Sequence, residues 1–373
     1  DGIHLEASKS CKIYENNPVS DNKWNGIYLK WCEESDIAGN EVTENDLSGL
    51  CLYESHTNFV RKRGDIPNKL TRNGEHGIRL DVSHHNQLYD NEITDNKKDG
   101  IRINRGRRNW ILGAHVIKDN DKNGIRLSGA VATQIKGAPP IVVNKWPIYP
   151  SVIQGNGENG IHFNYANANR LTNYHIKLHG TGMLLDYSHN NRFEGMWLGA
   201  NGLAVMERCS SHNNYGTSLM PCNLFTIVIE GCSTTESSLV GCTITGGEND
   251  AITCRNGANP TIRKSNIYDN DGVGINNQDP AITVDAQDNW WGDPSGPGGA
   301  GPGSGEEISG TVNFAHWRPV SVTLVAIADH DPYLAARGTT ESNEIHLSSW
   351  EAPTATLTVD LEDSRGWLEG PDT

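Results

Sequence analysis

Three arginines recur at nearly equal intervals, each inside one short phrase of Gly, an apolar residue, Arg and another apolar residue. The three copies are Gly77–Leu80, Gly100–Ile103 and Gly124–Leu127. If each copy is a strand whose apolar residues point inward, Arg79, Arg102 and Arg126 point outward, and parallel neighbours lie ~4.8 Å apart. Like charges this close repel each other unless anions lie nearby. Because a guanidinium binds a carboxylate in a fork, the row predicts a linear anionic polymer as partner.

The residues around this row are of the types that act on a polyuronate. A lyase or epimerase must neutralise the substrate carboxylate, remove the proton on the adjacent carbon and, in a lyase, help the leaving oxygen depart. We assign neutralisation to Arg102 or Arg126, proton removal to Tyr53, His84 or Arg79, and orientation of one of these, or of a metal, to Asp81. The candidate catalytic residues are Asp81, Arg102, Tyr53 and His84. The candidate substrate-binding residues are Tyr28, Arg79, Arg102, Arg126, His162 and Trp146.

Two other interpretations of the same face stay open. In the first, the arginines form an ordinary surface ladder paired with Asp81, Asp99 and other carboxylates. In the second, the site is that of a glycosidase, which needs two carboxylates at a defined separation. Asp81 with Asp99 or Glu54 would supply that pair.

Metal-binding patterns are weak, and we expect no metal and no cofactor. The segment Asp119–Gly124 resembles the start of a calcium loop, but no Glu follows at the twelfth position. His84 and His85 are adjacent, and adjacent residues of an extended chain point apart.

The phrase that carries the arginines recurs along most of the chain and predicts the fold. Copies start at Gly2, Gly26, Gly49, Gly77, Gly100, Gly124, Gly160, Gly182 and Gly202, with looser copies at Phe225, Ala251 and Gly274. Starts lie mostly 20 to 28 residues apart, a period typical of solenoids. The glycine is expected to supply a turn, and Asn-rich segments such as Asn86–Asn96 supply others. We predict an all-β chain that forms a right-handed parallel β-helix with a small C-terminal β appendage.

The predicted organisation is a β-helix of about twelve rungs over residues 1–318 and a C-terminal β-strand appendage or assembly segment over 319–373. Loop insertions are expected near 59–70 and 130–155. A groove walled by these loops along the arginine face would favour polysaccharide recognition, and a flat, paired face would favour a structural role. A Gly/Pro/Trp-rich stretch near 288–305 is expected to cap the last rung. The chain opens inside a repeat, so we expect a leader and an N-terminal cap upstream.

These strands, the Asn-rich turns and the stretch Asp288–Gly298 resemble the secreted parallel β-helix repeat superfamily. That superfamily includes pectate-lyase-like enzymes, mannuronan epimerases, phage tailspikes and a β-helical protein of bacterial copper maturation. The resemblance covers roughly residues 1–318 and implies a substrate lying along an outer strand face. The Asp-Pro-His motif typical of mannuronan epimerases is absent from this sequence.

Composition narrows the function classes. The net charge of −15 argues against general nucleic-acid binding, which needs a basic face, and no apolar run approaches the length of a membrane span. Residues 61–126 nevertheless carry 15 Lys and Arg against 9 Asp and Glu, so one sector is basic. We expect an extracellular or cell-surface protein that recognises an acidic polysaccharide, with cleavage or epimerisation left open. The alternative is a non-catalytic sheath, filament or adhesin component that self-assembles through open β-helix ends or the C-terminal segment.

Overall fold

The computed structural model describes residues 1–138, 141–143, 146–148, 150–199, 201–210, 212–216, 223–224, 226–231 and 236–321. Every regular element in these residues is a β-strand. The chain divides into two units, residues 1–321 and 322–373. The strands predicted for the C-terminal appendage fall almost entirely in the second unit, outside the described residues.

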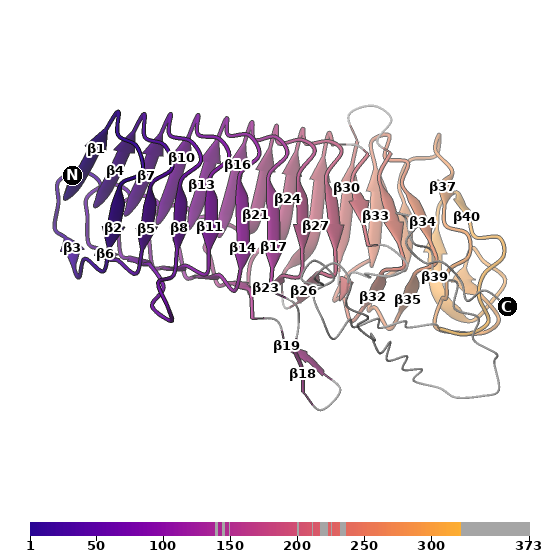
Figure 1. The fold of residues 1–373 in the computed structure, drawn as a ribbon. Coiled ribbons are helices and arrows are strands. Elements are labelled where there is room, and N and C mark those ends of the chain that lie inside the picture. The colour runs from indigo at the N-terminus through magenta and orange to yellow at the C-terminus, as the bar shows by residue number, and fades with distance from the viewer. Residues whose placement is uncertain are drawn as a thin grey trace, which may run out of the picture. The chain divides into compact units, whose positions relative to one another are not determined.

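Three parallel sheets contain nearly all the strands (Figure 1). Sheet 1 comprises, in spatial order, β1 (Ile3–Glu6), β4 (Ile27–Lys30), β7 (Leu50–Tyr53), β10 (Ile78–Asp81), β13 (Ile101–Asn104), β16 (Ile125–Ser128), β21 (Asn159–Asn164), β24 (Thr181–Asp186), β27 (Leu203–Arg208), β30 (Ile227–Glu230), β33 (Ile252–Arg255), β36 (Ile275–Asn277), β39 (Gly305–Ser309) and β38 (Pro297–Gly299). Sheet 2 comprises β2 (Lys12–Tyr14), β5 (Asp36–Ala38), β8 (Phe59–Arg61), β11 (Gln87–Tyr89), β14 (Trp110–Gly113), β17 (Gln134–Gly137), β22 (Arg170–Thr172), β25 (Arg192–Glu194), β28 (Asn214–Tyr215), β31 (Ser238–Val240), β34 (Thr261–Arg263), β37 (Val284–Asp285) and β40 (Val312–Asn313). Sheet 3 comprises β3 (Val19–Ser20), β6 (Glu41–Thr43), β9 (Lys69–Thr71), β12 (Glu92–Thr94), β15 (Val116–Lys118), β20 (Val152–Gln154), β23 (His175–Lys177), β26 (Trp197–Gly199), β29 (Asn223–Leu224), β32 (Thr243–Thr245) and β35 (Asn266–Tyr268).

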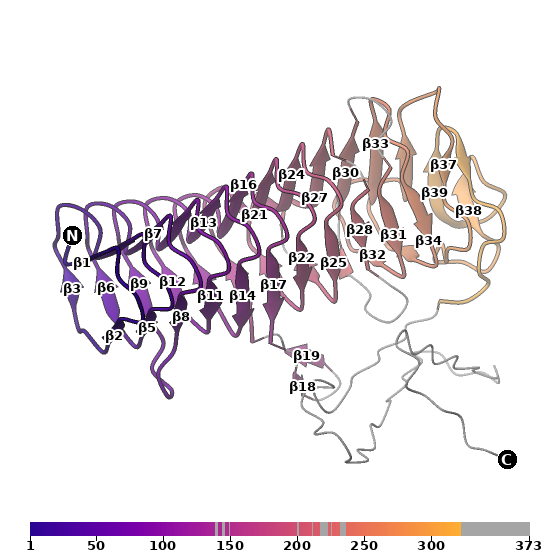
Figure 2. The ribbon, with the colours of Figure 1, turned by 45° about the horizontal axis from the view of Figure 1, so that its top comes forward.

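The chain visits the three sheets in turn, and up to β36 each strand of sheet 1 pairs with the one before it in an unshifted parallel register; at the C-terminal end β39 pairs with β36, and β38 pairs with β39 with a register shift. Ile78 pairs with Ile101, and Ile101 with Ile125, so equivalent positions of successive rungs stack in columns. Figure 2 shows the successive rungs stacked along the coil. The predicted parallel β-helix is therefore confirmed.

Alternation along each strand separates the core from the outer face. In β13 and β16 the exposures alternate between buried and half-buried, and Ile101, Ile103 and Leu127 are fully buried. Burial of such side chains, at roughly 1.5–3 kcal/mol each, drives the stacking that no single rung achieves alone.

Asparagines turn the chain at the corners and join the rungs into ladders. Asn86, Asn91 and Asn96 stand at successive corners of one rung and are all buried. The side-chain amide of Asn58 donates to Asn86 Oδ1 at 3.1 Å, and that of Asn86 donates to Asn109 Oδ1 at 3.2 Å. These bonds satisfy polar groups that would otherwise be buried without partners.

The glycines of the repeat lie at bends just before their strands, as predicted, but a left-handed backbone is not the reason for glycine there. None of Gly77, Gly100 and Gly124 has a positive φ. A Cβ at Gly100 would lie 2.7 Å from the carbonyl oxygen of Gly124 and 2.6 Å from Ile117 Cγ2. Glycine is required because adjacent rungs approach closely at this corner. The positive φ values occur at other corners, largely in residues with side chains.

Two insertions leave the coil at the same corner. The connection from β8 to β9 is lengthened and contains a bridge between Arg63 and Ile66. The connection from β17 to β20 contains the antiparallel pair β18 (Ile141–Val143) and β19 (Trp146–Ile148), which stands apart from the sheets in Figure 1. Both connections join sheet 2 to sheet 3, so their anchors do not border sheet 1. The described ends of both insertions are therefore attached away from the arginine face.

Candidate functional site

The candidate site lies on the outward face of sheet 1, where two columns of side chains run along the coil. The first column contains His4, Tyr28, Cys51, Arg79, Arg102, Arg126, His162 and Leu184. The second contains Glu6, Lys30, Tyr53, Asp81, Asn104, Ser128, Asn164, Asp186, Arg208 and Glu230. Sequence alternation thus predicted correctly which residues face outward.

Arg79, at one end of the row, is already paired. Its Nε donates to Asp81 Oδ2 at 2.7 Å, and its Nη1 lies 3.4 Å from Glu75 Oε2. Asp81 is 5% exposed because the guanidinium covers it. This part of the row fits the surface-ladder interpretation, and Asp81 is engaged in neutralising Arg79.

Arg102 and Arg126, by contrast, have no ion-pair partner among the described residues. The Nε atoms of both are buried and lack a hydrogen-bond partner, as does the nearby hydroxyl of Ser128. Leaving a buried donor unsatisfied costs about 1–3 kcal/mol, and two adjacent guanidinium groups add repulsion. An anion bound against the half-exposed guanidinium groups would relieve the repulsion.

His162 continues the first column beside Arg126 and contacts Asp186 on the next rung. Its Nε2 lies 3.0 Å from Asp186 Oδ2, and the ring is 9% exposed. Arg208 donates to the same carboxylate through Nε at 2.6 Å and Nη2 at 2.8 Å. No described residue hydrogen-bonds Nδ1 of His162. If Nε2 carries the proton that bonds Asp186, Nδ1 presents a lone pair, the arrangement of an oriented general base.

The electrostatic surroundings of His162 favour the neutral imidazole. Burial lowers the pKa of His162, and the charge of Arg126 lowers it further, while Asp186 opposes both. Burial alone would raise the pKa of Asp186, but hydrogen bonds from Arg208 and His162 outweigh it and bring the pKa below its usual range. At neutral pH the pair is therefore a neutral imidazole held by a carboxylate.

Two tyrosines that sequence analysis missed stand at the adjacent corner. Tyr165 and Tyr187 immediately follow strands β21 and β24, and their rings stack with centroids 5.0 Å apart and planes 5° from parallel. They are 59% and 47% exposed. Extending the outward columns by one residue, past the end of each strand, would have found them.

The remaining predicted residues lie in varied places. The hydroxyl of Tyr53 bonds Glu54, which raises the pKa of Tyr53 and makes it a weaker candidate base. His84 lies on a corner, stacked on His56 at 4.9 Å, and its Nδ1 accepts the backbone N–H of Arg107 at 3.1 Å, so that nitrogen is occupied. Tyr28 packs edge-on against His4.

The residues farther from the row do not assemble into a second site. Trp146 begins β19 in the inserted hairpin, a segment anchored at the corner between sheets 2 and 3. The carboxylates considered for a glycosidase are engaged elsewhere: Asp99 bonds Asn123 at 2.8 Å, and Glu54 accepts from Trp31 Nε1 at 2.7 Å.

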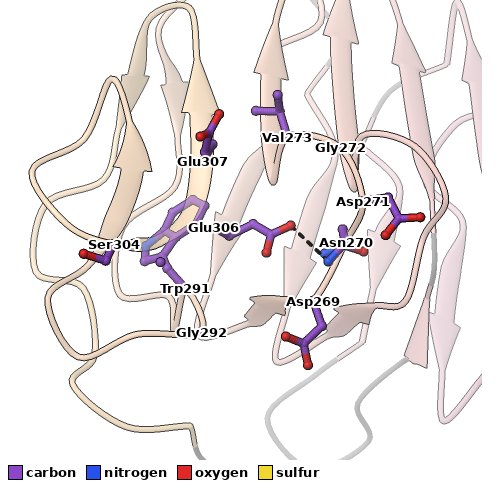
Figure 3. A pocket seen from close by; sticks show the side chains of 11 residues that line it. Asp269, Asn270, Asp271, Gly272, Val273, Trp291, Gly292, Ser304, Glu306 and Glu307 are labelled. Carbon is purple, nitrogen blue, oxygen red and sulfur yellow. Dashed lines mark hydrogen bonds between the residues drawn. The ribbon is translucent and has the colours of Figure 1, made fainter.

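A hollow near the C-terminal end of the coil is lined by acidic side chains, which would repel an anionic ligand. It encloses about 590 Å³ and is lined by Asp269, Asp271, Glu306 and Glu307 among others (Figure 3). Glu306 accepts the backbone N–H of Asn270 at 3.2 Å, and burial raises its pKa. We therefore centre the candidate site on sheet 1.

Two family models match parts of the chain, and one of them describes the fold. The family described as "right handed beta helix region" matches residues 1–138, and the family described as "periplasmic copper-binding protein (NosD)" matches residues 147–290. A mannuronan C5-epimerase of Pseudomonas putida is 34% identical over 87 residues, which are 23% of this chain and 16% of that protein. The A-module of an Azotobacter vinelandii mannuronan C-5 epimerase, a solved structure, is 14% identical over 75% of this chain and 90% of its own, with a TM-score of 0.30.

One of these descriptions names copper. Within the described ranges, no group of three or more His, Cys, Asp or Glu side chains is placed to hold a metal ion. The described residues therefore do not fit a copper centre built from these ligands. The same ranges contain no helix long and apolar enough to cross a membrane.

Proposed function

This chain belongs to the right-handed parallel β-helix superfamily, and from that premise we propose that it binds an anionic polysaccharide along the outward face of sheet 1. The observation that carries the proposal is the adjacent pair Arg102 and Arg126, whose buried Nε donors lack protein acceptors. A uronate carboxylate between the two guanidinium groups would accept from both and cancel their repulsion. The sequence similarity to a mannuronan C5-epimerase supports a uronate as the sugar.

We further propose that the bound sugar loses the proton next to its carboxylate. Nδ1 of His162 takes the proton, and the electron pair left on carbon delocalises into the carboxylate. Arg102 and Arg126 stabilise the extra negative charge, which is the interaction that strengthens most in the transition state. Asp186 holds the imidazole and stabilises the imidazolium. Return of a proton from water to the opposite face gives an epimer. Breaking the neighbouring C–O bond, with the departing oxygen taking a proton from water, forms a C=C bond and gives an unsaturated product.

The proposed location is outside the cytoplasm, in the periplasm or beyond. The match to a family described as periplasmic supports it, and so does the disulfide formed by Cys209, because disulfides persist in oxidising compartments. The proposal includes no metal ion, so polysaccharide binding should persist in EDTA.

Binding is tested by calorimetry with oligomannuronate, oligoguluronate and oligogalacturonate, using methyl-esterified fragments as uncharged controls. We expect Arg102→Gln or Arg126→Gln to weaken binding by roughly 10- to 100-fold, since hydrogen bonds to charged groups contribute about 1.5–3 kcal/mol. Arg263→Gln is the matched control, because Arg263 lies on sheet 2 and pairs with Asp285.

Proton removal is followed in the same samples by ultraviolet absorbance for unsaturated products and by NMR for epimers. The variant His162→Gln, which lacks the proposed base, is measured beside the parent and should form neither product. Binding without either product, in the parent, would contradict the catalytic step and leave a recognition module. If no acidic fragment bound the parent protein, the polysaccharide proposal would fail and the structural alternative, a sheath, filament or adhesin component, would replace it.

A further inference from the structure

The stacked pair Tyr165 and Tyr187 borders a hollow that the proposed carboxylate site does not use. The hollow encloses about 410 Å³ and lies over β21, β24, β27 and β30. Its lining includes Tyr165, Tyr187, Asp186, Arg208, Cys209 and Glu230. It therefore begins on the rung next to Arg126 and continues along the coil.

A small residue on the preceding rung leaves one side of this corner open. The corner position is Gly129 on the rung before Tyr165, and it is the disulfide-bonded Cys209 and then Gly231 on the rungs after Tyr187. A Cβ at Gly129 would meet only Arg105 Cγ, at 3.6 Å. With one ring per rung, the two rings form a short aromatic block, and about half of each residue is exposed.

The polar groups around the hollow are neutralised as pairs. Asp186 is held by Arg208, and Glu230 accepts from Arg255 Nη2 at 3.0 Å. Alternation of acid and base along the column leaves hydrogen-bonding atoms but little net charge. This chemistry differs from that of Arg102 and Arg126 and suits hydroxyl groups better than a carboxylate.

We propose that this hollow is a pyranose-binding subsite, in which a sugar ring lies against Tyr187 and its hydroxyls bond the Asp186–Arg208 and Glu230–Arg255 pairs. The inference rests on the proposed function and deepens it, because it sets the direction of the polymer. The chain runs along the coil, with a uronate carboxylate at Arg102 and Arg126 and the following sugars over Tyr165 and Tyr187. Aromatic side chains present an apolar face to the ring and leave its hydroxyls free to bond polar neighbours.

The test is the dependence of affinity on oligouronate length, measured by calorimetry from the disaccharide to the hexasaccharide. In the parent protein, affinity should rise as the added sugars reach the hollow. Tyr187→Ala should lose roughly three- to tenfold in affinity for the longer fragments and leave the disaccharide unchanged. Tyr187→Phe should keep the rise of affinity with fragment length, because the ring face and not the hydroxyl makes the contact. Trp24→Ala removes another exposed aromatic residue, 63% exposed, and should have no effect.

The outcomes separate this inference from the function on which it rests. If the parent binds oligouronates and Tyr187→Ala shows the same gain with length, the subsite is overturned while the carboxylate site stands. An equal loss in Tyr187→Phe and Tyr187→Ala would also overturn the stacking contact. Failure of the parent to bind any oligouronate would instead refute the proposed function.

Discussion

Arg126 lies opposite His162 in the parallel pairing of β16 with β21. A guanidinium without a carboxylate partner in the described residues thus borders an imidazole that a carboxylate holds from the other side. The charge of Arg126 lowers the pKa of His162 while Asp186 raises it. An anion-binding group therefore lies beside a neutral base.

Asp186→Asn should slow proton removal more than it weakens binding. The amide cannot stabilise an imidazolium, so we expect the rate of product formation to fall about 100-fold or more, while affinity for the disaccharide, which does not reach the hollow beside Tyr187, changes little. Asp36→Asn is the matched control, since Asp36 also pairs with an arginine, Arg61, but on sheet 2. Equal loss of rate and affinity in Asp186→Asn would indicate damage to the face and contradict a positioning role.

The pH dependence of the same reaction follows from the lowered pKa of His162. The base works only when neutral, so the rate should be constant at neutral pH and fall as the pH drops through the pKa of His162, which lies below the ordinary value of about 6.5. Removing Asp186 removes an interaction that raises this pKa, so the residual rate of Asp186→Asn should fall only at lower pH. If the rate of Asp186→Asn instead began to fall at a higher pH than the rate of the parent, His162 would be excluded as the base.

Gly100→Ala should destabilise the coil even though its φ is ordinary. The added Cβ would meet the backbone of the next rung, and overpacking of this kind costs about 1–3 kcal/mol. Gly180→Ala is the control, because its Cβ would find only Glu158 O, at 3.7 Å. Chemical denaturation gives the free energy of unfolding of both variants. Equal losses in Gly100→Ala and Gly180→Ala would contradict the explanation by close approach of the rungs.

Acid should destabilise the coil through buried histidines that replace asparagine in the ladders. His115 is fully buried, and its Nδ1 accepts the backbone N–H of Asn91 at 3.2 Å. Burial lowers its pKa, so the unfolded chain takes up the proton first. Its contribution to stability is present above about pH 6.5 and is lost as the pH falls from there toward the folded-state pKa.

The variant His115→Asn keeps an acceptor at this corner and removes the titration. Its free energy of unfolding should depend less on pH between about 6.5 and 5 than that of the parent. His316→Asn, at an exposed position, is the control for a His-to-Asn change outside the ladders. Identical pH dependence in all three proteins would contradict a contribution of His115 to acid sensitivity.

The fold could be predicted because its cause is local and repeated. Each rung contains the same alternation, so the buried column through Ile78, Ile101 and Ile125 follows from spacing alone. The purpose of the glycines could not be predicted in this way, because a close approach between rungs depends on distances across the coil, whereas a turn is a local property.

The site was only partly predictable for the same reason. Arg102 and Arg126 follow from the repeat, but their lack of partners depends on where every carboxylate lies. Asp81 illustrates this, because of the three residues it was expected to orient the structure pairs it with Arg79, a choice that spacing alone could not make. Tyr165 and Tyr187 were missed since they stand one residue beyond the strands, where the pattern of alternation ends.

The corner between sheets 2 and 3 has a consequence for how this scaffold varies. Both insertions leave there, and β8 pairs with β11, and β17 with β22, without a shift in register on one side of it. β9 pairs with β12, and β20 with β23, equally regularly on the other side. Chain length at this corner is thus uncoupled from the registry of the coil. A designer could graft a peptide or a whole domain between Arg61 and Lys69 and leave the face of sheet 1 as it is.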